Sequence, residues 1–137
     1  MIPRPHQAMV DLAGRIGTRI APEVQDPYAA VDAGLISMLL TMLAAEAGSG
    51  VDRRMQDAEE LKALFATAEA APGAESRARF LSSSPASMAL IQVNDWLGEG
   101  LRLLIDLHAW AEDHDEALNQ AIWDWLARHT DRHRFDI

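Results

Sequence analysis

Hydrophobic residues recur along the whole chain at the helical period, and no segment alternates apolar with polar residues over the length of a strand. This pattern predicts an all-α fold. Because the connections between helices are short, we expect an up-and-down bundle. The expected main helices are five, at about residues 5–21, 27–47, 49–70, 85–111 and 115–134, with one short extra helical segment at 75–81.

Capping residues, prolines and glycines predict where these helices begin and end. Asp26 can accept a hydrogen bond from the first free amides of the second helix, and Pro27 suits its first position. Gly48 is expected to end that helix. Ser49 is expected to cap the third helix and Ser84, followed by proline, to cap the fourth. Either aspartate of the turn near residues 113–115 can cap the fifth.

The third predicted helix is one-sided. An apolar stripe runs along one face, while the other positions carry charged and amide side chains that we expect to face water. Asp57 and Glu60 belong to this solvent-exposed set. The stripe predicted to be buried consists of Val51, Met55, Ala58, Leu61, Phe65 and Ala68.

Composition fits one folded domain over residues 1–137. Hydrophobic residues make up 49% of the 137 residues, and 12 basic against 21 acidic residues give a net charge of −9. An acidic surface repels phosphates, so we expect neither nucleic acid nor a membrane as a partner. The chain has no cysteine, and its first residues lack the apolar core of a signal peptide. We therefore expect a cytoplasmic protein.

The second and fourth helices are apolar around most of their circumference. Residues 33–45 contain no charge, but this stretch is shorter than the roughly 20 residues that a membrane span needs. We therefore interpret it as a buried helix. In the fourth helix, Asn94 and His108 fall on a leucine-rich seam, where we expect each to hydrogen-bond a neighbouring helix. A catalytic or ligand-binding role is the alternative for both.

Five helices cannot easily bury two such apolar helices, so we expect self-association as a two-fold dimer. The second helix carries a line of small residues that lets another helix approach closely, and the fourth helix carries an apolar line. In the alternative arrangement, the other three helices cover both. The candidate interface residues are Gly34, Ser37 and Thr41 on the second helix, and Trp96, Gly100, Leu103, Leu107 and Trp110 on the fourth.

No catalytic, nucleotide-binding or cofactor motif occurs in the sequence, which favours a non-enzymatic protein without a cofactor. Two histidine-containing pairs have metal-ligand spacing: His108 with Glu112, and His129 with His133. In an antiparallel hairpin the two pairs would lie roughly 13 Å apart along the helices. We therefore expect no metal site.

All four tryptophans lie in the last third of the chain. Trp123 falls outside the face of the fifth helix that we expect to be buried, which consists of Leu118, Ile122, Trp125 and Leu126. Trp123 is the best candidate for an exposed contact residue. We expect the protein to act through self-association and contact with a protein partner. The alternative is a carrier or sensor of a small apolar or aromatic ligand held among tryptophan and methionine side chains.

Overall fold

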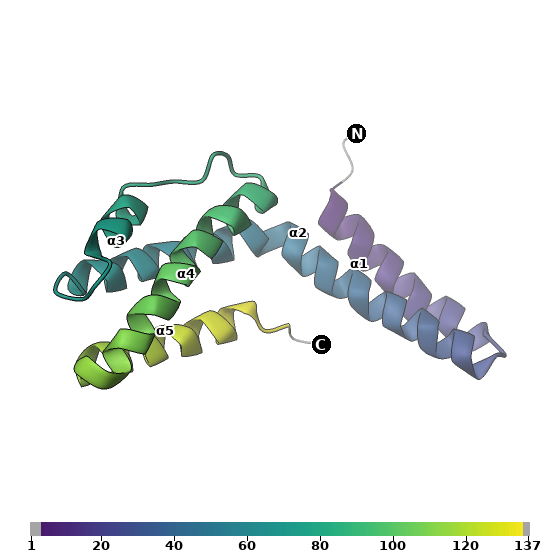
Figure 1. Cartoon of the computed structure of the whole chain (residues 1–137). Helices are drawn as coiled ribbons and strands as arrows, with labels where there is room; N and C mark the ends of the chain where they lie inside the picture. The colour runs from purple at the N-terminus through teal and green to yellow at the C-terminus, as the bar shows by residue number, and fades with distance from the viewer. Residues whose placement is uncertain (1–3, 136–137) are drawn as a thin grey trace. The chain divides into compact units, whose positions relative to one another are not determined.

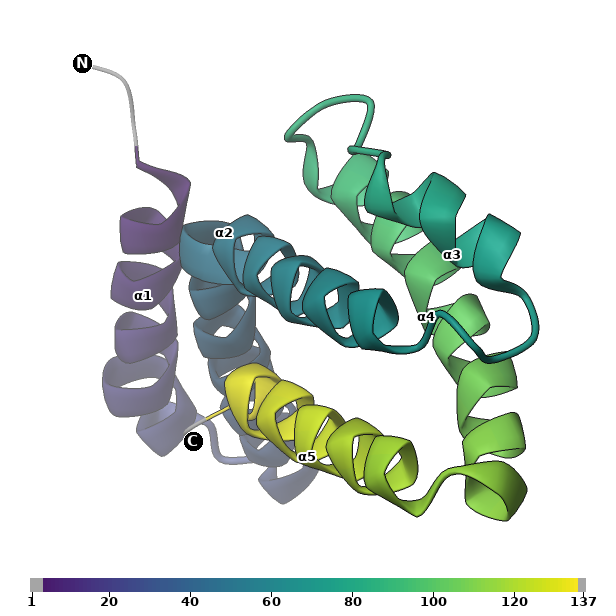
Figure 2. The same ribbon diagram turned by 90° about the vertical axis from the view of Figure 1, so that its left-hand side faces the viewer.

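A computed structural model describes residues 4–135, and it confirms the all-α fold: this part of the chain contains five α-helices and no strand (Figures 1 and 2). Residues 1–3, which belong to the N-terminal stretch from which we expected no signal peptide, lie outside the described part. A π-helical turn, Ile16–Ile20, and a 3-10 turn, Ala21–Glu23, follow the first helix. The α-helices are α1 (Pro5–Arg15), α2 (Pro27–Thr67), α3 (Ala74–Leu81), α4 (Leu90–His114) and α5 (Glu116–His133).

The described residues form two compact units, one up to Gly50 and the other over Val51–Arg134. In the first unit, α1 and the first half of α2 form a helical hairpin (Figure 2). The Ser37 hydroxyl donates to the Ala13 carbonyl across this hairpin at 2.9 Å. A Cβ atom on Gly17 would lie 2.9 Å from the Ser37 Oγ, so the absence of a side chain permits this close approach.

The start of α2 agrees with the sequence, because Asp26 Oδ1 accepts a hydrogen bond from the Tyr28 amide at 3.2 Å. The predicted end at Gly48 is wrong, since α2 continues through it to Thr67. Ser49 does not cap a new helix: its hydroxyl donates to the Ala45 carbonyl one turn earlier, as in a helix interior. A glycine commonly ends a helix by adopting positive φ, which Gly48 does not do; Gly73, at the start of α3, is the one described glycine with positive φ.

A buried arginine closes the turn that follows α2. The Arg77 guanidinium donates to the carbonyl oxygens of Ala68, Ala71 and Pro72 at 2.7, 2.8 and 2.5 Å. Carbonyls near the end of a helix have no partner within it, and these bonds satisfy carbonyls in the turn between α2 and α3. Burial lowers the pKa of Arg77 from its ordinary value.

The second unit encloses an apolar core between the second half of α2, α3, α4 and α5. The stripe predicted for the third helix is buried at Ala58, Leu61 and Phe65 of α2 and at Ala68 directly after it, and only partly at Val51 and Met55. The Phe80 ring of α3 stacks on Trp96 of α4, with 5.3 Å between ring centroids. On α5 the predicted face is buried at Leu118, Ile122 and Trp125 and only partly at Leu126.

The fourth helix begins at Leu90, so the predicted start at Ser84 is wrong. The physical reason is that Ser83, the residue before the predicted cap, accepts hydrogen bonds from side chains of α2 and α4. The Ser83 hydroxyl accepts from the Trp96 indole at 2.8 Å, and the Ser83 carbonyl accepts from the Lys62 ammonium at 2.7 Å. These bonds hold the segment between α3 and α4 outside a helix. The predicted aspartate cap of α5 is confirmed, because Asp115 Oδ1 accepts from the Leu118 amide.

Candidate functional site

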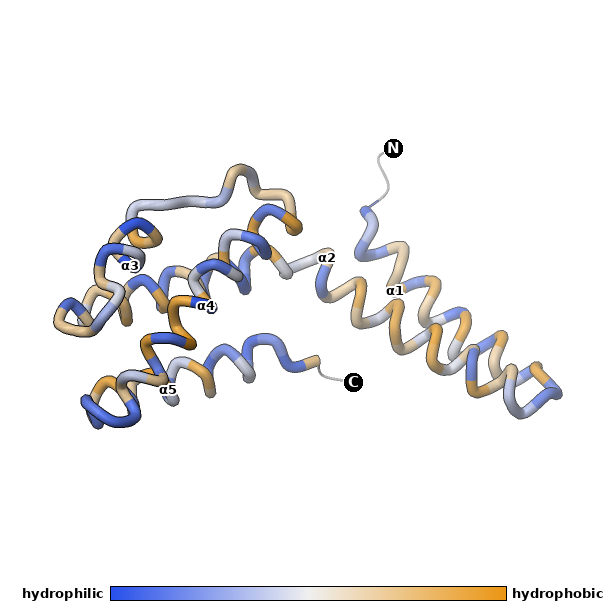
Figure 3. The backbone as a smooth tube through the Cα atoms, in the orientation of Figure 1, coloured by the Kyte–Doolittle hydropathy of each residue, from blue (hydrophilic) through white to orange (hydrophobic). Residues whose placement is uncertain are grey.

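Large apolar side chains lie exposed on the hairpin of the first unit. On α2 they follow a spacing of four residues from Val31 to Leu43, with Ile36 beside them. Figure 3 shows hydrophobic residues along both helices of this hairpin. We define the apolar ridge as Val31, Leu35, Leu39 and Leu43. Its residues are between 48% and 63% exposed.

The small residues of α2 are partly exposed and partly used within the hairpin. Ser37 is partly buried and bonds to α1, and the Thr41 hydroxyl donates to the Ser37 carbonyl of its own helix. Ala44 is buried, and a Cβ atom on Gly48 would meet His6 of α1 at 4.0 Å. Gly34 remains exposed. Ser37 of the small-residue line therefore joins α2 to α1, whereas Gly34, Thr41 and Gly48 are exposed.

The apolar line of α4 is mostly occupied by its own chain. Trp96, Gly100 and Leu107 are buried in the second unit, so our expectation that they form a surface for a second subunit is wrong. A Cβ atom on Gly100 would lie 2.5 Å from the Phe80 ring, which shows that α3 fills this position. Leu103 is half-buried, as is Trp110, whose ring stacks on His114.

Asn94 and His108 each hydrogen-bond a neighbouring helix, as the sequence predicts. His108 Nε2 lies 3.1 Å from Asn119 Oδ1 of α5. Asn94 Oδ1 accepts from Arg54 of α2, but Asn94 is exposed, so its expected burial is wrong. The seam faces away from the core at Asn94, near the start of α4. Trp123 is exposed, as expected from its position, and its ring lies edge-on to His108 with 5.2 Å between centroids.

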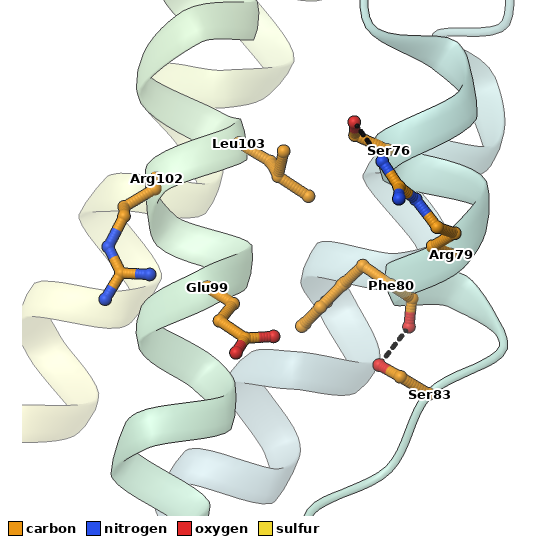
Figure 4. Close-up of a pocket in the computed structure, with 7 residues that line it drawn as sticks. All are labelled: Ser76, Arg79, Phe80, Ser83, Glu99, Arg102 and Leu103. Atoms are coloured by element: carbon orange, nitrogen blue, oxygen red, sulfur yellow. Dashed lines mark hydrogen bonds between the residues drawn. The ribbon is translucent and has the colours of Figure 1, made fainter.

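A groove of about 440 Å³ lies between α3 and α4 (Figure 4). Phe80 and Leu103 provide its apolar part, and the rest of its lining consists of serine and charged residues. Figure 4 shows Arg79 turned toward Ser76 of α3 and Arg102 on the side of α4 away from α3, so the two guanidinium groups do not converge on one point. The groove contains none of the tryptophan and methionine side chains among which we expected an apolar ligand.

A buried ionic cluster joins the second half of α2 to the end of α5. Its centre is Asp57, which has no exposed surface, contrary to the prediction that it faces water. Asp57 Oδ2 lies 2.8 Å from His129 Nδ1 and 2.5 Å from His133 Nε2. Asp57 Oδ1 accepts from Arg132, which also pairs with Glu60.

The electrostatics of this cluster favour an ionised Asp57. Burial raises the pKa of Asp57, but hydrogen bonds from His129 and His133, the charge of His129 and a hydrogen bond from Arg132 outweigh burial. The net result is a pKa below the ordinary value of 3.8. One oxygen from Asp57 and one nitrogen from each histidine lie within 4.8 Å of one another, the kind of group that can hold a metal ion.

The sequence indicated two of the three groups that converge here, His129 and His133, but not Asp57. The spacing of His129 and His133 places both on one face of a helix, but we compared them only with His108 and Glu112. His108 Nε2 lies 3.9 Å from Glu112 Oε1, at the opposite end of the α4–α5 hairpin. Asp57 is 72 residues from His129, so its approach depends on how α2 packs against α5.

Among the described helices, α2 is long and apolar enough to cross a membrane by length and composition. Comparison of the chain with protein-family models, with curated proteins and with solved structures gives no match in any of the three. The candidate functions therefore rest on the residues themselves: the apolar ridge, the groove and the cluster around Asp57.

Proposed function

We propose that this is a non-enzymatic cytoplasmic protein that acts through self-association, with the apolar ridge of the α1–α2 hairpin as the contact surface. The observation that carries the proposal is the exposure of four aliphatic side chains in one row. Burying apolar surface stabilises an assembly by about 25 cal/mol per Å². Contiguous apolar patches on soluble proteins commonly mark interaction sites.

The spacing of the ridge favours a helix of the same kind as its partner. Side chains four residues apart form a ridge along a helix, and two such ridges interdigitate when helices pack at about −50°. A second copy of the chain supplies a matching ridge by symmetry. A dimer with two-fold symmetry is the commonest closed assembly. This arrangement revises the dimer that we expected from the sequence, because α4 takes no part in it.

Charge and length favour a second copy over a lipid bilayer. The uncharged stretch 33–45 of α2 is bounded by Asp32 and Glu46. A bilayer span of α2, which needs roughly 20 residues, would place at least one of these two carboxylates in the hydrocarbon core, where a charge is costly. The net charge of −9 also opposes binding to anionic lipid and to nucleic acid. Binding of a small apolar ligand remains the alternative function, and contact with a different protein is a further use of the same surface.

Light scattering coupled to gel filtration tests the proposal. At tens of micromolar, we expect a mass of about twice the 15.1 kDa of one chain. Leu39→Glu places a charge in the middle of the ridge and should return the mass to that of one chain. Ile105→Glu is the matched control, because Ile105 is an aliphatic residue of α4 that is even more exposed than Leu39 and lies outside the ridge. This control should keep the wild-type mass.

Two outcomes would overturn the proposal. The first is a wild-type mass near 15 kDa over the whole concentration range. The second is an equal response to Leu39→Glu and Ile105→Glu, which would indicate that the ridge has no special role. Flotation with vesicles of anionic and neutral lipid tests the bilayer directly. Binding of a monomeric chain to vesicles would replace self-association with membrane attachment.

A further inference from the structure

We propose that Asp57, His129 and His133 form a binding site for one divalent transition-metal ion, with Zn²⁺ as the best match. Three potential ligand atoms from two helices converge on one point. Asp57 Oδ2 lies 2.8 Å from His129 Nδ1 and 2.5 Å from His133 Nε2. The two histidines are four residues apart on α5, a spacing by which a helix presents two imidazoles to one zinc ion.

The two oxygens of Asp57 have different partners. Oδ2 faces the two imidazoles, while Oδ1 accepts a hydrogen bond from Arg132. A metal-binding carboxylate commonly has its second oxygen hydrogen-bonded in this way, which fixes its orientation. The charge of Arg132 is offset by its pairing with Glu60, whose other oxygen accepts from Arg128 at 3.0 Å. Arg132 therefore pairs with two carboxylates, and its contact with Asp57 is through Oδ1, which leaves Oδ2 to the histidines.

The donor set selects the class of metal. Two imidazole nitrogens and one carboxylate oxygen suit Zn²⁺ and its late first-row neighbours, whereas Ca²⁺ and Mg²⁺ prefer sites made of oxygen atoms. Asp57 is fully buried, but the side chains of His129 and His133 are 29% and 24% exposed. The histidine side of the site is thus open to solvent, and water can take the fourth position.

Aromatic packing holds the first imidazole in place. The Trp125 ring stacks on His129 with 5.0 Å between centroids and 10° between planes. A ligand whose ring is fixed before binding loses less conformational freedom when the metal arrives. Without metal, the same three side chains are joined by hydrogen bonds. Metal binding would replace the protons that the imidazoles donate to Asp57 Oδ2.

Titration of the untagged chain with Co²⁺ and Zn²⁺ tests this site. We expect one Co²⁺ per chain and visible absorption bands typical of four-coordinate cobalt, with competition by Zn²⁺. His133→Ala removes one ligand near the end of α5 and should weaken Zn²⁺ binding by more than tenfold. His108→Ala removes a histidine that bonds to Asn119 outside the cluster, and it should keep the wild-type affinity.

Thermal denaturation provides a second readout that does not depend on absorption. Zn²⁺ should raise the melting temperature of the wild type and of His108→Ala relative to EDTA, because metal that binds only the folded state stabilises it. Circular dichroism establishes that His133→Ala is folded; if it is not, His129→Gln replaces it in the titration. Absence of saturable one-to-one binding would overturn the proposal. Equal Zn²⁺ affinity in the wild type and the folded ligand variant would also overturn it.

Discussion

Asp57 has no exposed surface, whereas the other charged residues of α2 are exposed or only partly buried. Burying a carboxylate is costly unless charged groups and hydrogen bonds compensate for the lost water. Here His129, His133 and Arg132 provide this compensation, all from the last turns of α5. Removing the partners of such a group leaves a buried charge, so the cluster also fixes where α5 lies on α2.

The lowered pKa of Asp57 predicts a specific dependence of stability on pH. A group whose pKa is lower in the folded state stabilises that state above its unfolded pKa, near 3.8 here. This contribution is lost as pH falls through the folded pKa. Between pH 5 and pH 2, the free energy of unfolding should therefore decrease more in the wild type than in Asp57→Asn. Urea denaturation measured across this pH range checks the difference.

The control for this prediction is Asp106→Asn, which changes an exposed aspartate of α4. This variant should follow the wild-type dependence on pH. The same slope in Asp57→Asn and the wild type would show that Asp57 does not couple proton binding to folding.

Substitution by alanine should change the stability of the fold in opposite directions at two glycines of α4, Gly98 and Gly100. A Cβ atom on Gly100 would lie 2.5 Å from the Phe80 ring, so Gly100→Ala must displace a core side chain. We expect it to destabilise the fold by about 1–3 kcal/mol. A Cβ atom on Gly98 would meet only the end of the Arg102 side chain, at 4.0 Å. Gly98→Ala should therefore stabilise the helix by up to about 1 kcal/mol.

Urea denaturation of both variants measures these changes, and each variant serves as the control for the other. Stabilisation by both substitutions would mean that α3 does not pack on α4 at Gly100.

At the scale of elements, α2 has two different roles along one helix. Its first half pairs with α1, and its second half belongs to the core of the second unit. Gly48 and Gly50 fall between these halves, and the helix passes through both. Glycine in a helix interior costs about 1 kcal/mol relative to alanine, which is too little to stop a helix that is stabilised on both sides.

The continuity of α2 predicts that Gly48→Ala increases stability by about 0.5–1 kcal/mol. Its Cβ atom would meet His6 at an ordinary contact distance of 4.0 Å. Gly73→Ala is the matched control, because Gly73 has a φ of 81° that disfavours a side chain. That variant should lose about 1–2 kcal/mol. Thermal and urea denaturation distinguish the two; a loss of stability in Gly48→Ala would indicate that α2 ends there.

At the scale of the whole molecule, apolar residues are buried very differently in the two units. The second unit encloses large side chains such as Leu61, Leu107 and Trp125. In the hairpin, the buried apolar residues are alanines, and the larger side chains of the apolar ridge are about half exposed. A hairpin with so little core of its own gains stability when another surface covers it.

This difference predicts that the melting temperature of the wild type rises with protein concentration, as it does when association stabilises the folded state. In Leu39→Glu the melting temperature should not change with concentration. Differential scanning calorimetry from about ten to several hundred micromolar measures both. An unchanged melting temperature in the wild type would indicate that the hairpin is stable without a second chain.

The sequence by itself determined the all-α class and the starts of α2 and α5. Helical periodicity, the Asp26 and Asp115 caps and the stripe through Ile122 and Trp125 act within a few residues, so they can be recognised without tertiary structure. The same local reasoning fails at Gly48 and Ser84. A glycine or a serine before proline permits a boundary, but packing and hydrogen bonds from distant residues decide whether the helix uses it.

Tertiary structure alone decided which polar and small residues lie inside. Asp57 becomes a core residue because α5 places two histidines and an arginine over it, more than 70 residues away in sequence. The space beside Gly100 is filled by Phe80 of α3, and Ser37 of the small-residue line of α2 bonds to α1. Periodicity shows that a helix has an apolar face, but not which neighbour covers it. The choice of neighbour depends on contacts between segments far apart in the chain.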